Sequence, residues 1–296
     1  MYIIQKKENP NSNILIYISY IWLFNPLILT VSSRGNSESF LSIFILLTIY
    51  FLKCQNLILA GIMFGLSVHI KLYPVIYSFP IYFYLCQTMK FFHCIKPNRS
   101  HFKFGISVSV TCTLISTLFY LIYGWDFLYN SYFYHLHRVD IKHNFSVYFY
   151  AQYLLTNSHI LKLFGMVLFV PQCILLVVLS WQHRKNVIFN MLLCTIVFVA
   201  FNKVATSQYF MWHLFLLPNA ISDIPFRKLI PLILSYIAWF SCQSIWLYFA
   251  YKLEFEGRQV FIFVWLASIL FLISHVVKIK TLIKLIANIN VKNKVS

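Results

Sequence analysis

Ionisable side chains are concentrated in the twelve residues from Tyr134 to Phe145, which contain three His, one Arg, one Lys, one Asp and one Asn. Charged residues make up only 10% of the whole chain. Because ionisable groups are costly near a bilayer, a dense cluster of them predicts a functional site. Aromatic residues flank the cluster at 132–134 and at 145–150. This composition is typical of a pocket for a polar or anionic head group on an apolar tail.

Two roles are open for the cluster. In the first, Arg138 and Lys142 form a basic cradle for a phosphate, and Asp140 orients a cation or a sugar hydroxyl. In the second, Asp140 only neutralises its basic neighbours within a loop. We favour the cradle, for which the further substrate-binding candidates are His135, His143 and Asn144. The spacing of the histidines at 135, 137 and 143 matches no zinc site, so no metal is predicted. Asn144 also begins a glycosylation sequon, which we expect to be unmodified because a glycan would block this patch.

A second polar patch, residues 32–39, lies between two apolar segments. Arg34 and Asn36 are candidate substrate-binding residues there, because an Arg beside the N–H groups of a helix start suits a phosphate. Glu38 would lie in the first turn of the following helix, where the helix dipole favours a carboxylate. The alternative is a capped helix start, with Asn36 or Ser37 as the cap and Arg34 paired to Glu38.

Two further patches carry fewer charges. His69 and Lys71 precede Pro74, which should end or kink a span. They are candidate substrate-binding residues, although a Lys at a span end can simply snorkel to the interface. The last patch, 201–210, offers Asn202, Lys203 and Gln208 for sugar hydroxyls, and its alternative is a polar loop between short spans.

Apolar segments long enough to cross a bilayer separate these patches. The chain has 296 residues, of which 60% are hydrophobic, and a mean hydropathy of +0.74. This composition predicts an all-α, polytopic membrane protein that forms one domain over 1–296. The sequence predicts about ten transmembrane helices, at 13–32, 39–52, 56–70, 72–89, 104–123, 160–182, 187–201, 208–221, 229–250 and 259–277.

The net charge of +17 does not indicate nucleic-acid binding, because the cations collect in short loops between the spans. With a cytoplasmic N-terminus, sixteen of the 24 Lys and Arg residues fall on the cytoplasmic side, as the positive-inside rule requires. The predicted loops on the other side are about 33–38, 124–158, 202–207 and 251–258, and a basic cytoplasmic tail covers 278–296. All four polar patches then lie on the non-cytoplasmic side.

The seven cysteines are scattered and include no CxxC pair. None falls in the loops that we assign to the non-cytoplasmic side. We therefore expect small apolar fillers, neither disulfides nor metal ligands.

Four ordered blocks carry a family resemblance. They are 24–27 with 32–39, then 65–74, 132–145 and 201–210, and residues 254–257 fit a later loop of the same family. Together they resemble the catalytic subunits of GPI mannosyltransferase I, over nearly the whole chain.

The resemblance implies a multi-spanning glycosyltransferase of the GT-C class. Its donor would be dolichyl-phosphate mannose, its acceptor a glucosaminyl-(acyl)phosphatidylinositol, and the new bond α-1,4. It further implies a luminal active site in the endoplasmic reticulum membrane, a small single-span stabilising subunit and no cofactor. The basic end of the chain, Lys-Asn-Lys-Val-Ser, resembles a dilysine retrieval signal and agrees with that location.

One departure from the family concerns its acidic motif. The family has an Asp-x-Asp type motif in a first luminal loop, whereas this sequence contains none. We therefore expect a chain that lacks its N-terminal span and first luminal loop. Asp140 and Glu38 are the candidate catalytic carboxylates that remain. The alternatives are a secondary transporter or lipid-phosphate flippase, and a non-catalytic truncated homologue.

Overall fold

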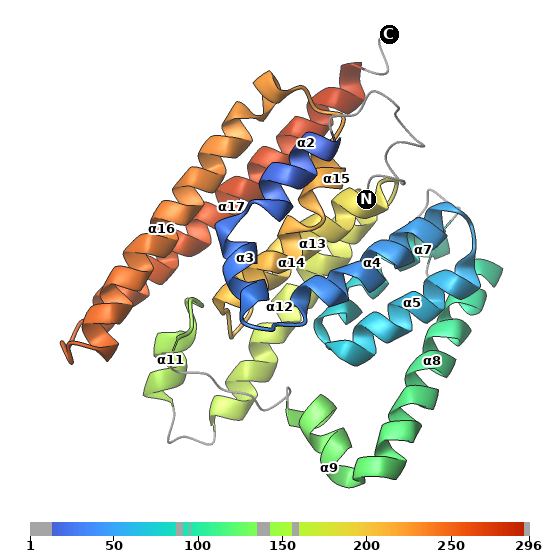
Figure 1. The fold of residues 1–296 in the computed structure, drawn as a ribbon, viewed down its shortest axis with the longest axis horizontal. Coiled ribbons are helices and arrows are strands. Elements are labelled where there is room, and N and C mark those ends of the chain that lie inside the picture. Colours follow the sequence, from blue (N-terminus) through green and yellow to red (C-terminus); the bar gives the residue numbers. More distant parts are fainter. Residues whose placement is uncertain (1–13, 87–90, 95, 135–142, 156–159, 293–296) are drawn as a thin grey trace. The chain divides into compact units, whose positions relative to one another are not determined.

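The computed structural model describes residues 14–86, 91–94, 96–134, 143–155 and 160–292. Every regular element among these residues is a helix (Figure 1). The chain divides into two compact units. Unit 1 comprises residues 1–138, 173–195 and 208–223, and unit 2 comprises residues 139–172, 196–207 and 224–296. The all-α prediction is thus confirmed for the described residues.

Unit 1 holds the N-terminal helices. Its elements are α2 (Ile14–Ile18), η1 (Ser19–Leu23), α3 (Pro26–Ser33), α4 (Glu38–Lys53), α5 (Leu57–Ile70), η2 (Tyr73–Tyr77), α6 (Ser78–Leu85), α7 (Phe91–Cys94), α8 (Arg99–Tyr123), α9 (Trp125–Leu128), η3 (Tyr129–Phe133), α14 (Met211–Leu214) and α15 (Leu217–Ile221).

Unit 2 is built around a long hairpin of α16 (Ile230–Glu254) and α17 (Phe261–Lys292), preceded by η5 (Phe226–Leu229). It also contains α11 (Phe149–Leu154). The unit boundaries fall inside α12 (Ile160–Gln182) and α13 (Val187–Ala200), and at the start of η4 (Ser207–Phe210).

In the described part of the chain, three helical segments, 99–123, 226–254 and 261–287, are long and apolar enough to cross a membrane. The pair 14–23 and 26–33 adds a fourth if its two bent parts form one span. Two residues explain the bend of 54° between the two parts. The Asn25 side chain caps the second part by accepting from the Leu27 N–H, and Pro26 has no N–H to donate to the preceding turn. The helices lie close to the predicted positions, but several are too short to count as spans, so the predicted number of ten is not confirmed.

Two helix bounds differ from the prediction for local reasons. Helix α8 begins at Arg99 instead of 104, because the Asn98 side chain accepts from the His101 N–H while the His101 ring accepts from the Asn98 N–H. Helix α17 runs well past 277, where the basic tail was expected to begin. The side chain of Lys278 is fully buried against the rings of Tyr236 and Trp239, so this charge does not end the helix.

A disulfide joins Cys86 and Cys94. The prediction that no cysteine forms a disulfide is therefore wrong. Helix α7 brings Cys94 back toward the end of α6, where the Tyr82 hydroxyl donates to the Cys94 carbonyl oxygen at 2.8 Å. A separation of eight residues gives no periodic signal in the sequence, so this approach depends on the tertiary fold. Five cysteines are free, at 54, 112, 173, 194 and 242.

Two glycines of α5 allow it to lie close against α8 (Figure 1). A Cβ atom added at Gly61 would lie 2.7 Å from the Ser107 Cβ and 2.8 Å from the Phe104 carbonyl oxygen. One added at Gly65 would lie 2.9 Å from the Thr111 Cβ. Small residues four apart are a common means of bringing membrane helices together. Gly61 contacts residues of α8 that precede those contacted by Gly65, so the two helices run parallel.

We expect Gly61→Ala to lower the thermal unfolding midpoint in detergent, because overpacking of this kind costs about 1–3 kcal/mol. Gly105→Ala is the matched control, since Gly105 lies on α8 with open space around its Cβ position. Alanine is the better helix former, so this control should be neutral or stabilising. Equal shifts of the unfolding midpoint in the two variants would contradict close α5–α8 packing.

Candidate functional site

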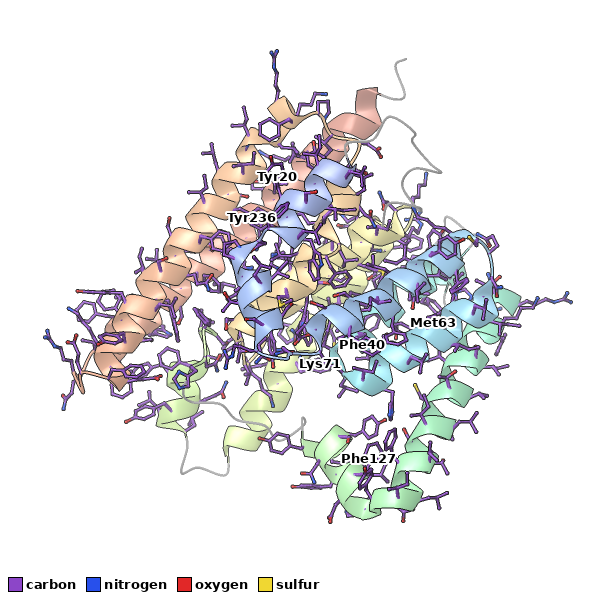
Figure 2. All side chains as sticks on the ribbon, viewed as in Figure 1. Tyr20, Phe40, Met63, Lys71, Phe127 and Tyr236 are labelled. Atoms are coloured by element: carbon purple, nitrogen blue, oxygen red, sulfur yellow. A yellow bond between two sulfur atoms is a disulfide. The ribbon has the colours of Figure 1, made fainter. Side chains whose placement is uncertain are left out.

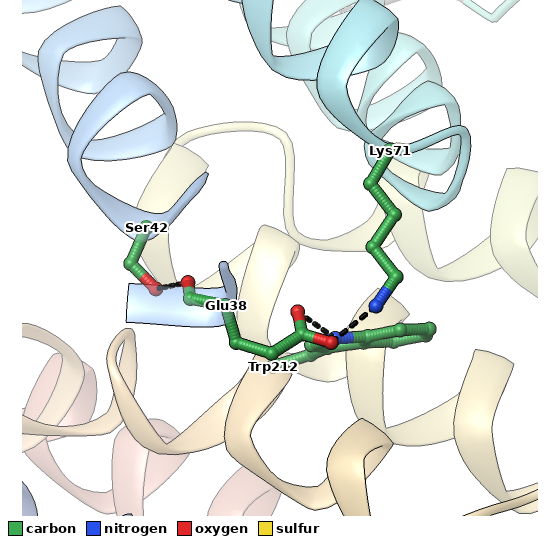
Figure 3. A network of polar contacts seen from close by, with 4 residues as sticks. All are labelled: Glu38, Ser42, Lys71 and Trp212. Atoms are coloured by element: carbon green, nitrogen blue, oxygen red, sulfur yellow. Dashed lines mark hydrogen bonds and ion pairs between the residues drawn. The ribbon is translucent and has the colours of Figure 1, made fainter. Parts of the chain in front are cut away.

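A buried carboxylate lies at the start of α4. The Glu38 side chain is 1% exposed, and both of its oxygens are engaged (Figure 3). Its Oε1 forms an ion pair with Lys71 Nζ, and its Oε2 accepts from Trp212 Nε1 at 2.8 Å. Because an unpaired buried charge is strongly destabilising, this geometry ties three distant segments of unit 1 together.

Aromatic rings surround this ion pair. The Trp212 ring stacks with Tyr73 at 3.7 Å between centroids and with Tyr209 at 4.1 Å. The ammonium of Lys71 lies 5.2 Å from the Trp212 ring centroid. We call these five residues the Glu38 cluster: Glu38, Lys71, Tyr73, Tyr209 and Trp212. Lys71 keeps 30% of its side chain exposed, so the cluster presents a cation fixed by a buried acid.

Local sequence signals explain how Lys71 comes to face Glu38. Helix α5 ends at Ile70, Lys71 has an extended backbone, and η2 follows with Pro74 in its first turn. The prediction that Pro74 ends or kinks a span is thus confirmed, since the helix is broken before it. Glu38 does lie in the first turn of α4, and Ser37 is the N-cap residue, although its side chain makes no capping hydrogen bond.

The alternative interpretation, in which Arg34 pairs with Glu38, is wrong on this point, because the cation paired with Glu38 is Lys71. Arg34 caps the end of α3 and is exposed, and Gly35 follows it with a φ of +71° that turns the chain toward α4. Asn36 is half-exposed in the same turn. Neither side chain has a hydrogen-bond or ion-pair partner among the described residues, so their substrate contacts stay predictions.

In unit 2, Asn144 joins two loop segments. Asn144 is 1% exposed. Its side-chain amide donates to the Lys203 carbonyl oxygen at 3.0 Å and accepts from the N–H groups of Ala205 at 2.8 Å and Ser146 at 3.0 Å. Ser146 Oγ donates to the Asn202 carbonyl oxygen at 2.6 Å. The Asn144 amide is therefore enclosed by backbone, and its burial supports the expectation that the sequon is unmodified.

The same loop is held by Gln152 and by His143. Gln152 Nε2 donates to the Lys203 carbonyl oxygen at 2.7 Å. His143, with a φ of +54°, donates its backbone N–H to Glu254 Oε1 at 3.3 Å, and its Nδ1 lies 3.0 Å from Glu254 Oε2. Glu254 therefore holds one edge of the predicted cradle. We call Asn144, Ser146, Gln152 and the backbone of 202–205 the Asn144 cluster.

The remaining candidates fall into two groups. His135, Arg138, Asp140 and Lys142 lie outside the described residues, so the phosphate cradle stays a prediction. His69 and Gln208 are described: the His69 ring contacts the Tyr132 hydroxyl at 3.2 Å, and Gln208 is half-exposed in η4. No three His, Cys, Asp or Glu residues in the described ranges come close enough to hold a metal ion.

Sequence reasoning missed Trp212, Tyr73 and Glu254 as partners of the predicted residues. A signal was available, because a lone acid in an apolar sequence must find a cation or an N–H donor. The sequence does not show which donor that is, since Trp212 lies far from Glu38 along the chain.

Comparison with known proteins gives a consistent result. Residues 31–283 match the model of a family described as mannosyltransferase (PIG-M). "GPI mannosyltransferase 1" of Dictyostelium discoideum is 39% identical over 91% of this chain and 66% of its own length. "GPI alpha-1,4-mannosyltransferase I, catalytic subunit" of Danio rerio is 40% identical over 86% of this chain and 66% of its own length.

A third relative, "GPI mannosyltransferase 1" of Saccharomyces cerevisiae, is 37% identical over 88% of this chain and 66% of its own length. The chain thus spans about two thirds of the length of these curated relatives. The matched region 31–283 contains both the Glu38 cluster and the Asn144 cluster.

Proposed function

The chain belongs to the mannosyltransferase (PIG-M) family, and from this membership we propose that it transfers the first mannose in the synthesis of GPI anchors. The donor is dolichyl-phosphate mannose, the acceptor is glucosaminyl-(acyl)phosphatidylinositol and the new bond is α-1,4. The observation that carries the proposal is the family match over 31–283, which the identities of 37–40% to GPI mannosyltransferases support.

The proposed protein is a multi-pass GT-C enzyme of the endoplasmic reticulum membrane with about ten spans and a luminal site. In this proposal the helices too short to count as spans by length complete the membrane crossings as tilted or broken segments. A small single-span subunit stabilises the enzyme, and no cofactor takes part.

In the proposed reaction, the acceptor hydroxyl oxygen forms a bond to C1 of the mannose. The bond from C1 to the phosphate oxygen breaks, and dolichyl phosphate departs with the electron pair. A general base takes the hydroxyl proton. A β-linked donor and an α-linked product require inversion at C1. The family resemblance assigns this base to the acidic motif of a first luminal loop, so Asp140 is a supporting carboxylate in this proposal.

Cations near the departing phosphate stabilise its developing charge. Arg34, Arg138 and Lys142 have this role in the proposal, together with Lys71. Glu38 is a positioning residue instead of the base, because both of its oxygens are already engaged. It fixes Lys71, whose ammonium stays partly exposed.

Mannose transfer in membranes tests the function. Cells that lack their own enzyme for this step would express the longest protein that the gene encodes, and their microsomes would receive labelled dolichyl-phosphate mannose. We expect a labelled mannosyl-glucosaminyl-phosphatidylinositol that α-mannosidase digests. Movement of the donor across the bilayer without any such product would overturn the proposal in favour of a transporter.

The proposed orientation rests on the distribution of charge. The connections before α5 and α8 lie at one end of unit 1, because these helices run parallel, and this end carries Lys53, Arg99 and Lys103. The positive-inside rule assigns it to the cytoplasm. The Cys86–Cys94 disulfide near the start of α8 argues for the opposite side, since disulfides persist in oxidising compartments. The proposed orientation follows the charge, because many residues carry it.

Cys54 decides between these orientations, because it is the exposed free cysteine of the described residues and lies directly after α4. In sealed microsomes, whose outer face is cytoplasmic, we expect a membrane-impermeant maleimide to label Cys54 without detergent. Cys54→Ser should remove this label. Labelling that requires detergent would reverse the proposed orientation.

A further inference from the structure

An aromatic segment, residues 120–134, forms the end of α8 and continues through α9 and η3. It contains eight aromatic side chains and a single charged one. Trp125, Tyr129 and Phe133 recur at every fourth position, so they share one side of the segment, and the rings of Trp125 and Phe133 stack at 5.8 Å between centroids. We call these three residues the aromatic face. They are 61%, 48% and 43% exposed, so the rest of the chain does not cover this face.

The other side of the segment is fixed to the protein. Phe127 lies between α9 and α8 (Figure 2), where its ring stacks on Phe119 at 5.5 Å between centroids. The Tyr132 hydroxyl lies 2.8 Å from Ser116 Oγ on α8 and 3.2 Å from His69 Nδ1 on α5. These contacts set the rotation of α9 and η3 about their own axes. The outward direction of the aromatic face is therefore part of the fold.

The length of α8 indicates the depth of the segment in a membrane. Its 25 residues span about 38 Å at 1.5 Å per residue, which exceeds a hydrocarbon core of about 30 Å. The helix therefore ends near the membrane surface, where Gly124 turns the chain with a φ of +66°. Ser116 lies seven residues before Tyr123, about 10 Å back along the helix. Because Tyr132 contacts Ser116, η3 returns to about this depth instead of continuing into water.

The aromatic face continues the lipid-facing surface of α8. None of the most apolar stretch of α8 is buried inside the protein, and Leu118 and Leu121 near its end are exposed. Beside the aromatic face runs a polar stripe of Asp126 and Asn130, both exposed, in which the Asn130 amide donates to the Asp126 carbonyl oxygen at 2.9 Å. Trp and Tyr rings at the end of a span, next to a polar stripe, are typical of a helix that lies in the membrane interface.

We propose that α9 and η3 form an interfacial anchor, whose aromatic face inserts among the lipids of the leaflet in which α8 ends. Residues 120–134 contain no Lys or Arg, so the anchor binds through its rings and does not require anionic lipid. The inference goes beyond mannose transfer and needs only that α8 crosses the membrane. It places the start of the aqueous loop after Tyr134 instead of at 124. The chain thus enters the ionisable cluster 134–145 from the level of the lipid head groups.

Photocrosslinking of the full chain in phosphatidylcholine vesicles tests the anchor. Tyr129→benzoylphenylalanine replaces one exposed aromatic side chain by another, so the fold is preserved. On irradiation we expect an adduct with the mass of one phospholipid, and adding phosphatidylserine should not change its yield. Asn130→benzoylphenylalanine is the matched control on the polar stripe and should lose most of this adduct. Leu118→benzoylphenylalanine, on the exposed side of α8, should give the adduct as Tyr129→benzoylphenylalanine does.

Other crosslinking results would overturn the proposal. Equal lipid adducts at 129 and 130, or none at 129, would show that the aromatic face is not directed toward lipid. The same irradiation in microsomes covers the case of a protein partner. There, an adduct of position 129 with a second protein, in place of lipid, would show that this face is a protein interface.

Fluorescence quenching measures the depth of the anchor independently. The emission of Trp125 is the difference between the parent protein and Trp125→Phe, a variant that keeps an aromatic ring. Lipids brominated near the head group should quench this difference more than lipids brominated near the chain end. The reverse order, or no quenching by either lipid, would overturn the interfacial depth. Neither measurement uses activity, so mannose transfer without these signals would overturn the anchor alone, and these signals without transfer would overturn the proposed function alone.

Discussion

Replacing Lys71 by methionine is expected to destabilise the protein by about 3–5 kcal/mol, the usual cost of breaking one side of a buried ion pair. The cost is high because the Glu38 carboxylate is 1% exposed and would keep only the hydrogen bond from Trp212. Methionine preserves the length and most of the apolar surface of lysine, so the change removes mainly the charge. The free energy of unfolding would be measured by denaturant titration in detergent.

Companion variants separate the stability of this pair from its chemistry. The double variant Glu38→Gln with Lys71→Met removes both charges and should recover most of the lost stability, since neutral replacements of buried pairs are often tolerated. If Lys71 also stabilises the departing phosphate, this folded double variant should still lose mannose transfer. Lys71→Arg, which keeps a cation, should retain part of it. Full transfer by the double variant would show that the pair is purely structural.

The Glu38 cluster illustrates which parts of a site the sequence can predict. The position of Glu38 at a helix start and the break at Pro74 follow from local chemistry, and both were predicted. The partner of Glu38 was not, because proximity along the chain favours Arg34, which is instead exposed in the turn before α4. Only the tertiary fold brings Lys71 and Trp212 to the carboxylate.

In unit 2 as well, local sequence signals predict the helices but not the contacts between them. Hydropathy predicted α16 and α17 as a pair of apolar segments, but not the polar contacts between them. Trp246 Nε1 donates to Ser268 Oγ at 3.0 Å, and Trp239 Nε1 donates to His275 Nε2 at 3.1 Å. These contacts recur at steps of seven residues on each helix, which is about two turns along one face. A polar partner inside an apolar hairpin fixes its register, because a shift would leave each group without its contact.

The segment 134–145 is predicted least completely. Its composition indicated a head-group pocket, yet the residues of its described end, His143 and Asn144, hold the loop in place. Side-chain amides and imidazoles can serve either purpose, and composition does not separate the two. Burial and the identity of the acceptor separate the two purposes. Asn144 is only 1% exposed, and its amide donates to a backbone carbonyl, so it serves to hold the loop. Glu254, which the sequence assigned to a later loop, is part of the same support.

Replacing Asn144 by alanine is the second substitution for which we expect a large effect. It would leave the buried N–H groups of Ser146 and Ala205 without their acceptor. Each unsatisfied buried group costs about 1–3 kcal/mol, so the total for the two groups should be about 2–6 kcal/mol. The Lys203 carbonyl oxygen would keep the bond from Gln152, which limits the loss. Because the substitution frees the loop from residues 202–205, we also expect mannose transfer to fall at least about tenfold.

Two variants make this expectation specific. Asn144→Asp keeps both accepted bonds but turns an anion toward the Lys203 carbonyl oxygen, so its stability should lie between those of Asn144→Ala and the parent. Asn130→Ala is the matched control, because Asn130 is exposed and its single bond, to the Asp126 carbonyl oxygen, stays within one turn of the chain. That change should be worth less than about 0.5 kcal/mol. If Asn144→Ala were as stable as Asn130→Ala, then the three bonds of Asn144 would not hold these segments together, and the fixed geometry of the loop would need another cause.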